Sequence, residues 1–284
     1  MRAASQGTGE AGNLAPRREA CFKPCMSDIT LLAADEPDPV RVLRADGASE
    51  LFFTADHAGR EIPRRLGRLG VPETELLRHI AWDIGIRGVT ERLSAAFDAT
   101  AVFQTYSRLV IDCNRDPGVP SAIPEVSEHT PVPGNIGLTE ADKAARVAAI
   151  FTPYHDRIEA LLNARAVAGR RTVYIAMHSF TPTFKGESRA MEIGVLHNRD
   201  TRLAGILLDL LRAEGDLTVG DNAPYAVSDL TDFGVPRHAE RRGLPHVEIE
   251  IRQDLIADAA GEAAWAERMA RLLAAADARL KAAG

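Results

Sequence analysis

The chain has 284 residues, of which 45% are hydrophobic and 26% charged, and its formal net charge is −6. This composition is typical of a folded globular protein and excludes a disordered or fibrous chain. The arginines are scattered rather than clustered, and the pI is near 5.8. Both features argue against a basic surface that binds nucleic acid or a membrane. We therefore expect a small-molecule ligand.

Residues 1–26 are small, polar and aperiodic, which predicts a disordered tail in front of a single domain at residues 27–284. Met26 opens a more apolar stretch and is a candidate for the natural start. The tail lacks the apolar region of a secretory signal, and no stretch approaches the ~20 apolar residues of a membrane-spanning helix. The chain has only three cysteines, and a small, odd number of cysteines argues against a disulfide framework. We therefore expect a cytoplasmic protein.

Strands and helices are predicted to alternate along the chain. Short runs rich in β-branched or aromatic residues predict strands, and apolar residues at helical spacing predict helices. The expected strands are 50–56, 99–107, 108–114, 172–178, 191–198 and 246–252, and the expected helices are 72–97, 139–169, 200–215 and 263–283. This alternation predicts a three-layer α/β fold, in which helices cover both faces of a mostly parallel or mixed sheet.

Residues 115–138 contain five prolines and have no clear periodicity. An irregular stretch of this length inside a compact domain is usually a lid or a binding loop. We therefore expect this segment to border a functional site.

Three predicted strands carry polar side chains near their ends. His57 follows the first strand, His178 ends the strand at 172–178, and Glu248, Glu250 and Arg252 share one face of the last strand. In open α/β sheets, ligands bind in the crevice at the carboxyl ends of the strands. Two histidines and a carboxylate with an open fourth position are typical of a catalytic zinc, which activates a bound water.

Spacing alone leaves other interpretations open. A histidine at a strand end can be a hydrogen-bonded structural residue. A buried Glu250 can be paired with Arg252 or with another arginine, because an unpaired carboxylate is costly inside a protein.

Six segments resemble the N-formylglutamate amidohydrolase family and occur in the expected order. They are FTADHAGREIP, HIAWDIGIRGV, SRLVIDCNRD, MHSFTP, GDNAPY and VEIEIRQDL. The resemblance runs from about Phe52 to Leu255. It implies a zinc-dependent amidase with the zinc exopeptidase or phosphorylase-hydrolase-like fold. It also implies an N-acyl acidic amino acid as the substrate, with N-formylglutamate giving formate and glutamate as the type reaction.

The resemblance also implies roles for individual residues. His57 and His178 match the zinc ligands, and Asp83 is our choice for the third ligand. Glu61 is its rival, because carboxypeptidase-like sites use an H-x-x-E pair and Glu61 follows His57 by four residues. Glu250 matches the general base that takes a proton from the metal-bound water.

Several side chains are candidates for substrate binding. Arginines can hold the carboxylates of an acidic substrate through paired hydrogen bonds, and one of them can instead face the oxyanion. The candidates are Arg108, Asn114, Arg115 and Arg252, together with the loop residues Asn135, Asn222 and Tyr225. Asp112 is expected to orient an arginine. His155 is either a residue that orients a metal ligand or a hydrogen-bonded helix histidine.

Other reaction classes fit the sequence less well. No G-x-S-x-G motif occurs, and Cys113 has no evident histidine base. The remaining alternatives are a carboxypeptidase-like enzyme or a deacylase of other N-acyl amino acids, and an inactive relative that binds a metal or a small molecule. The expected partner is a small N-acyl amino acid, without nucleic acid or membrane, and the oligomeric state is left open.

Overall fold

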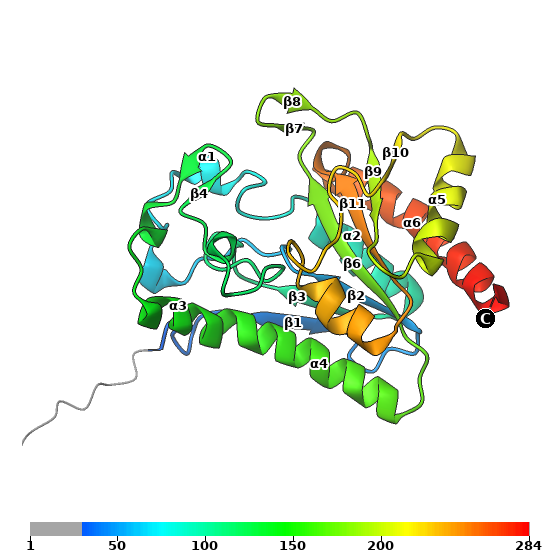
Figure 1. Ribbon diagram of the computed structural model, residues 1–284, viewed down its shortest axis with the longest axis horizontal. Helices are drawn as coiled ribbons and strands as arrows, with labels where there is room; N and C mark the ends of the chain where they lie inside the picture. The colour runs from blue at the N-terminus through cyan, green and yellow to red at the C-terminus, as the bar shows by residue number, and fades with distance from the viewer. Residues whose placement is uncertain (1–29, 284) are drawn as a thin grey trace, which may run out of the picture.

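The computed structural model describes residues 30–283, so the predicted tail at residues 1–26 lies outside the described residues. A seven-stranded sheet runs through the molecule in the order β1-β3-β2-β6-β11-β9-β10 (Figure 1). Its strands are β1 (Val40–Leu43), β2 (Leu51–Ala55), β3 (Thr100–Gln104), β6 (Val173–Phe180), β9 (Ile193–Leu196), β10 (Val219–Asp221) and β11 (His246–Arg252).

The four central strands of this sheet are parallel. β3, β2, β6 and β11 run in one direction, whereas β1 at one edge and β9 with β10 at the other run in the opposite direction. The carboxyl ends of the four central strands therefore meet at one edge of the sheet, which is where ligands bind in folds of this class.

Helices cover both faces of the sheet (Figure 1). One face packs against α2 (Ile86–Phe97), α5 (Arg202–Glu214) and α6 (Ala259–Ala283), and the other packs against α4 (Thr152–Val167). Side chains of β2 alternate between the two cores, with Phe53 in the first and Phe52 in the second. The predicted three-layer α/β fold is confirmed. Among residues 30–283, no helix combines the length and the apolar character needed to cross a membrane.

The predicted helix at 139–169 is confirmed as one continuous helical segment. It consists of α3 (Glu140–Arg146), a π-helical turn at Val147–Phe151 and α4. Thr139 begins it with a capping box, in which the Thr139 hydroxyl accepts from the Asp142 backbone N–H. Pro153 lacks a backbone N–H, and the wider π-helical turn directly before α4 accommodates the missing hydrogen bond.

The single helix predicted at 72–97 is wrong. The segment divides into α1 (Glu73–Leu76) and α2, and residues 77–85 between them form turns. Gly85 has a φ of +79°, and a Cβ at this position would lie 1.9 Å from the Ile256 carbonyl oxygen. The Asp83 backbone N–H donates to the His57 carbonyl instead of to a helical partner. The break therefore places Asp83 beside the end of β2.

The strand predicted at 108–114 is also wrong, because these residues form turns behind β3. Leu109, Val110 and Ile111 are buried, but they pack in the core between the sheet and α4 rather than within the sheet. The backbone N–H groups of Arg108 and Asp112 donate to carbonyls of other loops. A short apolar run cannot distinguish a buried strand from a buried turn.

Several small elements are not apparent from the sequence. Strands β1 and β10 have only four and three residues. Two short hairpins pair β4 (Val126–Ser127) with β5 (Thr130–Pro131), and β7 (Thr183–Phe184) with β8 (Glu187–Ser188). Short helical turns lie at Arg64–Leu66, Pro120–Ala122, Pro133–Asn135, Val235–Ala239, Glu240–Arg242 and Gln253–Ile256.

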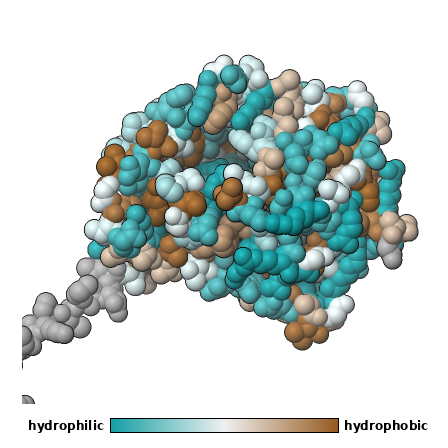
Figure 2. Space-filling model, viewed as in Figure 1, coloured by the Kyte–Doolittle hydropathy of each residue, from teal (hydrophilic) through white to brown (hydrophobic). Residues whose placement is uncertain are grey.

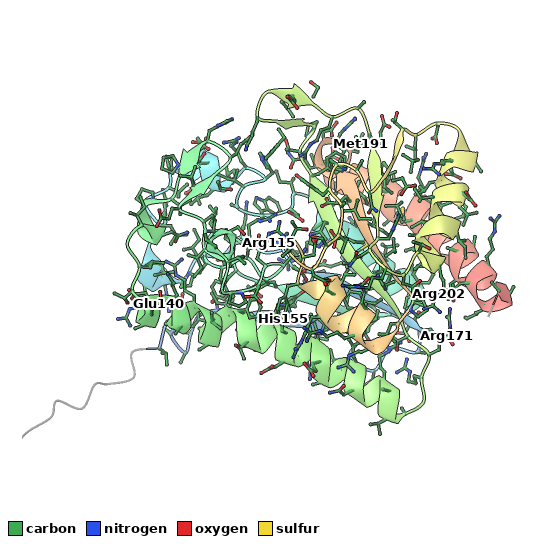
Figure 3. The ribbon with its side chains drawn as sticks, in the orientation of Figure 1. Arg115, Glu140, His155, Arg171, Met191 and Arg202 are labelled. Atoms are coloured by element: carbon green, nitrogen blue, oxygen red, sulfur yellow. The ribbon has the colours of Figure 1, made fainter. Side chains whose placement is uncertain are left out.

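His155 is a hydrogen-bonded histidine within α4 (Figure 3) and does not line the cavity described below. Its Nε2 donates to the Cys113 carbonyl at 2.9 Å, and its Nδ1 lies 2.8 Å from Nε2 of His238. A carbonyl only accepts, so the neutral His155 ring accepts at Nδ1 from the His238 N–H. Burial lowers the pKa of His155 to about 4 and that of His238 to about 2.

This histidine pair is expected to make the fold sensitive to acid. Below the unfolded-state pKa of about 6.5 the unfolded chain binds protons that the folded chain does not, so stability falls between pH 6.5 and pH 4. From pH 7 to pH 5 the loss should be about 2 kcal/mol for each histidine. Urea unfolding at both pH values measures it. The double variant His155→Leu with His238→Leu should lose less stability over this interval, and an equal loss would contradict the prediction.

Candidate metal centre and active site

A cavity of about 500 Å³ opens at the carboxyl ends of the four parallel strands. Its wall includes His57 after β2, His178 on β6 and Glu250 on β11, together with Asp83 from the turn before α2. Figure 2 shows a mostly hydrophilic surface on this face of the molecule, with hydrophobic residues scattered through it. Four of the polar side chains that the sequence placed near strand ends, those of His57, His178, Glu248 and Glu250, thus converge in one cavity.

His57, Asp83 and His178 form a group that can hold a metal ion. One ligand atom from each lies within 4.8 Å of those of the other two, and all three residues are buried. Asp83 Oδ2 lies 3.4 Å from His57 Nδ1 and 3.0 Å from His178 Nδ1. Among the described residues, His57 Nδ1 is buried without a hydrogen-bond partner. His178 Nδ1 is within hydrogen-bond distance of the same Asp83 oxygen, so the unpartnered His57 nitrogen beside this carboxylate is the feature that fits a metal ion.

Asp112 fixes the orientation of His57. The His57 Nε2 lies 2.7 Å from Asp112 Oδ1, and Arg108 donates to Asp112 Oδ2 from Nε at 3.1 Å and from Nη2 at 2.6 Å. Burial raises the pKa of Asp112, but Arg108 and His57 outweigh it and hold this pKa well below its usual range. The ionised Asp112 favours a proton on Nε2 of His57, which would leave the Nδ1 lone pair for a metal ion bound between His57 and Asp83.

Asp56 lies behind the second histidine. Its Oδ2 is 3.9 Å from His178 Nε2, and both atoms are buried without a hydrogen-bond partner among the described residues. The Tyr154 hydroxyl donates to the other oxygen of Asp56. Asp56 was not among the sequence candidates, although it directly precedes His57 at the end of a buried strand.

Glu250 lies next to the histidine-aspartate group. It pairs in register with His178 across β11 and β6, and its Oε2 is buried without a hydrogen-bond partner among the described residues. Burial raises the pKa of Glu250 to about 7, although His178 opposes this shift. A carboxyl group with a pKa near neutrality can both take and give a proton. Glu248 also lines the cavity, from the same face of β11.

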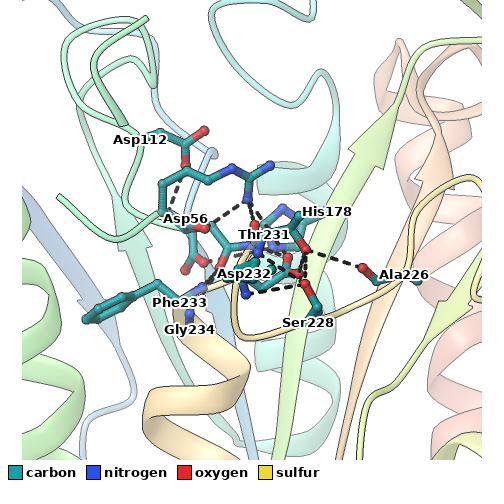
Figure 4. Close-up of polar contacts among 12 residues, drawn as sticks. Asp56, Asp112, His178, Ala226, Ser228, Thr231, Asp232, Phe233 and Gly234 are labelled. Atoms are coloured by element: carbon teal, nitrogen blue, oxygen red, sulfur yellow. Dashed lines mark hydrogen bonds and ion pairs between the residues drawn. The ribbon is translucent and has the colours of Figure 1, made fainter. Parts of the chain in front are cut away.

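Asn114 and Arg115 reach the cavity from the turns behind β3. The Asn114 side-chain oxygen accepts from the backbone N–H groups of Phe233 and Gly234, and its amide donates to Asp232 at 3.1 Å. Figure 4 shows Asp232, Phe233 and Gly234 in the same region as His178. Arg115 lies near the centre of the molecule (Figure 3), 4.0 Å from its nearest carboxylate. Its Nη1 donates to the Asn114 carbonyl at 2.9 Å and to the Thr231 carbonyl, so its other donors remain available and its charge is only loosely paired with a carboxylate.

The structure does not bring three predicted substrate-binding residues to this cavity. Arg252 donates to Asp254 at 2.8 Å and to the carbonyls of Ala190 and Met191. Figure 3 shows Met191 well apart from Arg115, which does line the cavity. Asn135 is buried and holds the carbonyls of Leu109 and Pro124. Asn222 accepts from the His197 backbone N–H. Each of these side chains is occupied by contacts within the protein.

Glu61, the rival third ligand, is exposed and does not reach the two histidines. It lines a separate groove with Trp82 and Arg87. Its backbone pairs with the chain after β3, where its N–H donates to the Thr105 carbonyl and its own carbonyl accepts from Ser107. This pairing directs the Glu61 side chain away from the cavity.

Further residues of the cavity wall were not among the sequence candidates. His79 lies in the same turn region as Asp83, and Phe180 and Phe184 come from β6 and the β7–β8 hairpin. The proline-rich segment adds Pro124 and Val126, in agreement with its predicted place beside a functional site. No spacing rule identifies His79 or Phe184, because the turn and the hairpin that place them have no periodic pattern. Phe180 lies on β6, beyond the predicted end of that strand at residue 178.

Asp112→Asn is expected to weaken metal binding without unfolding the protein. Asparagine keeps the shape but loses the charge that fixes His57 and pairs with Arg108, so zinc affinity should fall about 10- to 100-fold. Competition with a coloured chelator measures this affinity. Asp116→Asn is the matched control, because Asp116 is an exposed carboxylate of the same loop. Equal affinities for wild type and Asp112→Asn would show that Asp112 does not support His57.

The chain shares its fold and much of its sequence with a solved bacterial protein. The structure of gene product Atu2144 from Agrobacterium tumefaciens is 41% identical, with a TM-score of 0.85 over 88% of this chain and 99% of that chain. An N-formylglutamate amidohydrolase from Ralstonia eutropha JMP134 shares the fold at 18% identity. Its TM-score is 0.59, over 85% of this chain and 98% of that chain. A comparison with curated proteins gives no significant match.

The sequence profile described as FGase, N-formylglutamate amidohydrolase, matches residues 49–257. This region begins just before β2 and ends after β11. It therefore contains all the strands whose carboxyl ends border the cavity, together with His57, Asp83, His178 and Glu250. The match covers well over half of the chain. The protein belongs to the N-formylglutamate amidohydrolase family of hydrolases.

Proposed function

We propose that the protein is a zinc-dependent amidohydrolase that cleaves the amide bond of an N-acyl acidic amino acid such as N-formylglutamate. The observation that carries this proposal is the buried group of His57, Asp83 and His178 with Glu250 beside it in one open cavity. Family membership supplies the reaction class, and the side chains of the cavity agree with it.

The donor set favours zinc. Two imidazole nitrogens and one carboxylate oxygen are the ligands of many catalytic zinc sites that keep a position open for water. His57, Asp83 and His178 would hold the ion, which when bound lowers the pKa of its water and polarises the substrate carbonyl.

Glu250 acts as the general base and then as the general acid. With a pKa near 7, its carboxylate takes a proton from the attacking water and passes it to the amine that leaves. Its Oε2 has no competing hydrogen bond within the described residues, so it is free to make this transfer. The products are a carboxylic acid and a free amino acid.

Arg115 is the residue that we assign to substrate binding. The side chain of Asn114 is held by Phe233, Gly234 and Asp232 and supports the cavity wall beside it. Arg115 has only a distant carboxylate partner, whereas Arg108 is held by Asp112 and also lies 3.5 Å from Asp83. A loosely paired arginine can bind a substrate carboxylate through two parallel hydrogen bonds. We therefore assign Arg108 to fixing Asp112 and Asp83, with its remaining donors directed at the developing oxyanion.

The main alternative is a deacylase with a different acyl preference. Residues of the proline-rich segment between Pro117 and Pro133 line part of the cavity and would shape the acyl pocket. Exchange of this segment for that of a relative with another acyl preference should move the preference with it, and an unchanged preference would count against this role.

A substrate panel tests the proposed function. Zinc-loaded protein should release formate from N-formylglutamate and N-formylaspartate, and much less from N-formylleucine. Treatment with a chelator should abolish hydrolysis, and added zinc should restore it. A carboxypeptidase control substrate, such as a blocked dipeptide, should remain uncleaved. Failure to hydrolyse every N-acyl amino acid by the zinc-loaded protein would overturn the proposal and favour the inactive metal-binding relative.

A further inference from the structure

A substrate with two carboxylates needs a second cationic partner in the cavity. Arg108 is occupied by Asp112 and Asp83, and Arg252 lies outside the cavity with Asp254. Of the three arginines predicted from the sequence, only Arg115 is then available to bind a substrate carboxylate. The second partner must come from a residue that the sequence did not single out. This inference rests on the proposed function and names its substrate class.

Arg189 directly follows the β7–β8 hairpin; it is not itself a residue of the cavity wall, but its guanidinium stacks against three aromatic residues that are. Its guanidinium carbon is 4.8 Å from the ring centre of Phe184 and 4.7 Å from that of Tyr225. A third ring, Phe180, lies at 5.8 Å. All three aromatic residues line the cavity wall. Stacking against aromatic rings orients a guanidinium without using its hydrogen-bond donors.

The donors of Arg189 are mostly free. Its Nη1 donates to the Tyr225 hydroxyl at 2.8 Å, and no ion pair to Arg189 occurs within residues 30–283. A guanidinium carries five N–H donors, so one such bond leaves most of them available. The Arg189 backbone N–H donates to the Pro182 carbonyl at 2.8 Å, which closes the hairpin and fixes the start of the side chain.

Tyr225 connects this arginine to the catalytic end of the cavity. Its hydroxyl accepts from Arg189, and its ring lines the same cavity as Glu250 and Arg108. Tyr225 thus holds the guanidinium from the loop after β10, while Phe184 holds it from the hairpin after β6. Two segments far apart in the sequence fix one partly buried arginine that has no carboxylate partner.

We propose that Arg189 binds the side-chain carboxylate of an N-acyl glutamate or aspartate and thereby selects acidic substrates. Arg115 is then left for the other carboxylate of the substrate. A planar guanidinium that is held on its faces presents its edge to a carboxylate, and a neutral side chain of the same shape cannot replace that charge-assisted contact.

The test combines an arginine variant with a change in the substrate. Wild type, Arg189→Met and Arg189→Lys are assayed with N-formylglutamate and with N-formylglutamine, which lacks the charged carboxylate. Arg189→Met should lose about 10- to 100-fold in kcat/KM for N-formylglutamate and less than about threefold for N-formylglutamine. Most of the loss should appear in KM. Arg189→Lys should recover part of the activity.

Two further variants control this comparison. Arg202→Met changes an arginine on α5 that pairs with Asp200 and lies far from the cavity (Figure 3), so it should behave like wild type with both substrates. Arg252→Met tests the rival candidate. Equal losses with the two substrates in Arg189→Met, or a selective loss in Arg252→Met instead, would overturn the proposal. Zinc content and thermal unfolding of Arg189→Met should match those of wild type.

A binding measurement separates this inference from the proposed amidase function. Calorimetric titration with glutamate and with glutamine needs no turnover, and wild type should prefer glutamate while Arg189→Met should not. If wild type hydrolyses no N-acyl amino acid but shows this preference, the amidase proposal fails and the role of Arg189 stands. Equal glutamate binding by wild type and Arg189→Met, including none by either, overturns the role of Arg189.

Discussion

Replacing Glu250 by glutamine is expected to reduce hydrolysis by about 10²- to 10⁴-fold while the protein keeps its metal. Glutamine has nearly the same shape but cannot take a proton from water or return one to the leaving amine. Glu250 is not one of the three residues that meet as a metal group, so zinc content should stay at the wild-type level. The loss should appear in kcat rather than in KM, because the substrate contacts remain.

The measurement is steady-state hydrolysis of N-formylglutamate together with metal analysis of the same samples. Glu248→Gln is the matched control, because Glu248 lies two residues away on the same buried face of β11 and also borders the cavity. It should lose far less activity than Glu250→Gln. If the two variants lose equal activity, or if Glu250→Gln stays active, the assignment of Glu250 as the proton carrier is wrong.

Asp83→Ala is expected to remove the metal from the protein, whereas Glu61→Ala should leave it in place. Asp83 contributes a buried oxygen that faces both histidines, while Glu61 is exposed and lines another groove. Loss of a ligand should cost more than the about 10- to 100-fold in affinity that follows loss of a residue supporting a ligand. Hydrolysis should disappear with the metal.

Elemental analysis by mass spectrometry after gel filtration measures this difference. His57→Ala and His178→Ala serve as positive controls, because both should bind as little zinc as Asp83→Ala. Asp83 is not a ligand if its alanine variant keeps about one zinc per chain. Loss of zinc in Glu61→Ala instead would identify the H-x-x-E-like alternative. Circular dichroism should confirm that each variant is folded, because Asp83 also holds the turn before α2.

The local sequence predicted the layers and the ends of the main strands. β2 and β11 lie within one residue of their predicted bounds, because both are buried and have a clear strand composition, with Phe52, Phe53 and Thr54 in β2 and a β-branched residue at every second position of β11. The long helix from 139 to 169 was equally clear from the helical spacing of its apolar residues, and the structure adds the cap at Thr139. The predicted proximity of His57 and His178 rests on the same strand assignments, because a parallel sheet brings the carboxyl ends of its strands together.

Long-range contacts decided what the sequence pattern left open. Residues 72–97 and 108–114 look regular as isolated sequence. Asp83 and Asp112 nevertheless lie in turns, because backbone and side-chain bonds to the end of β2 replace the local hydrogen bonds. The choice between Asp83 and Glu61 depends on this geometry, and so does the difference between Arg252 and Arg189.

The sequence by itself determined the α/β class and the family resemblance, and it predicted the two histidines and Glu250 as site residues, because these inferences depend on short-range patterns along single strands. The tertiary structure decided which carboxylate lies beside the two histidines and which arginines lack a close carboxylate partner. These properties depend on partners that are distant in the chain, such as Asp112 for Arg108 and Tyr225 for Arg189. The spacing of residues along the chain does not predict such pairs, because loops without periodicity bring their members together.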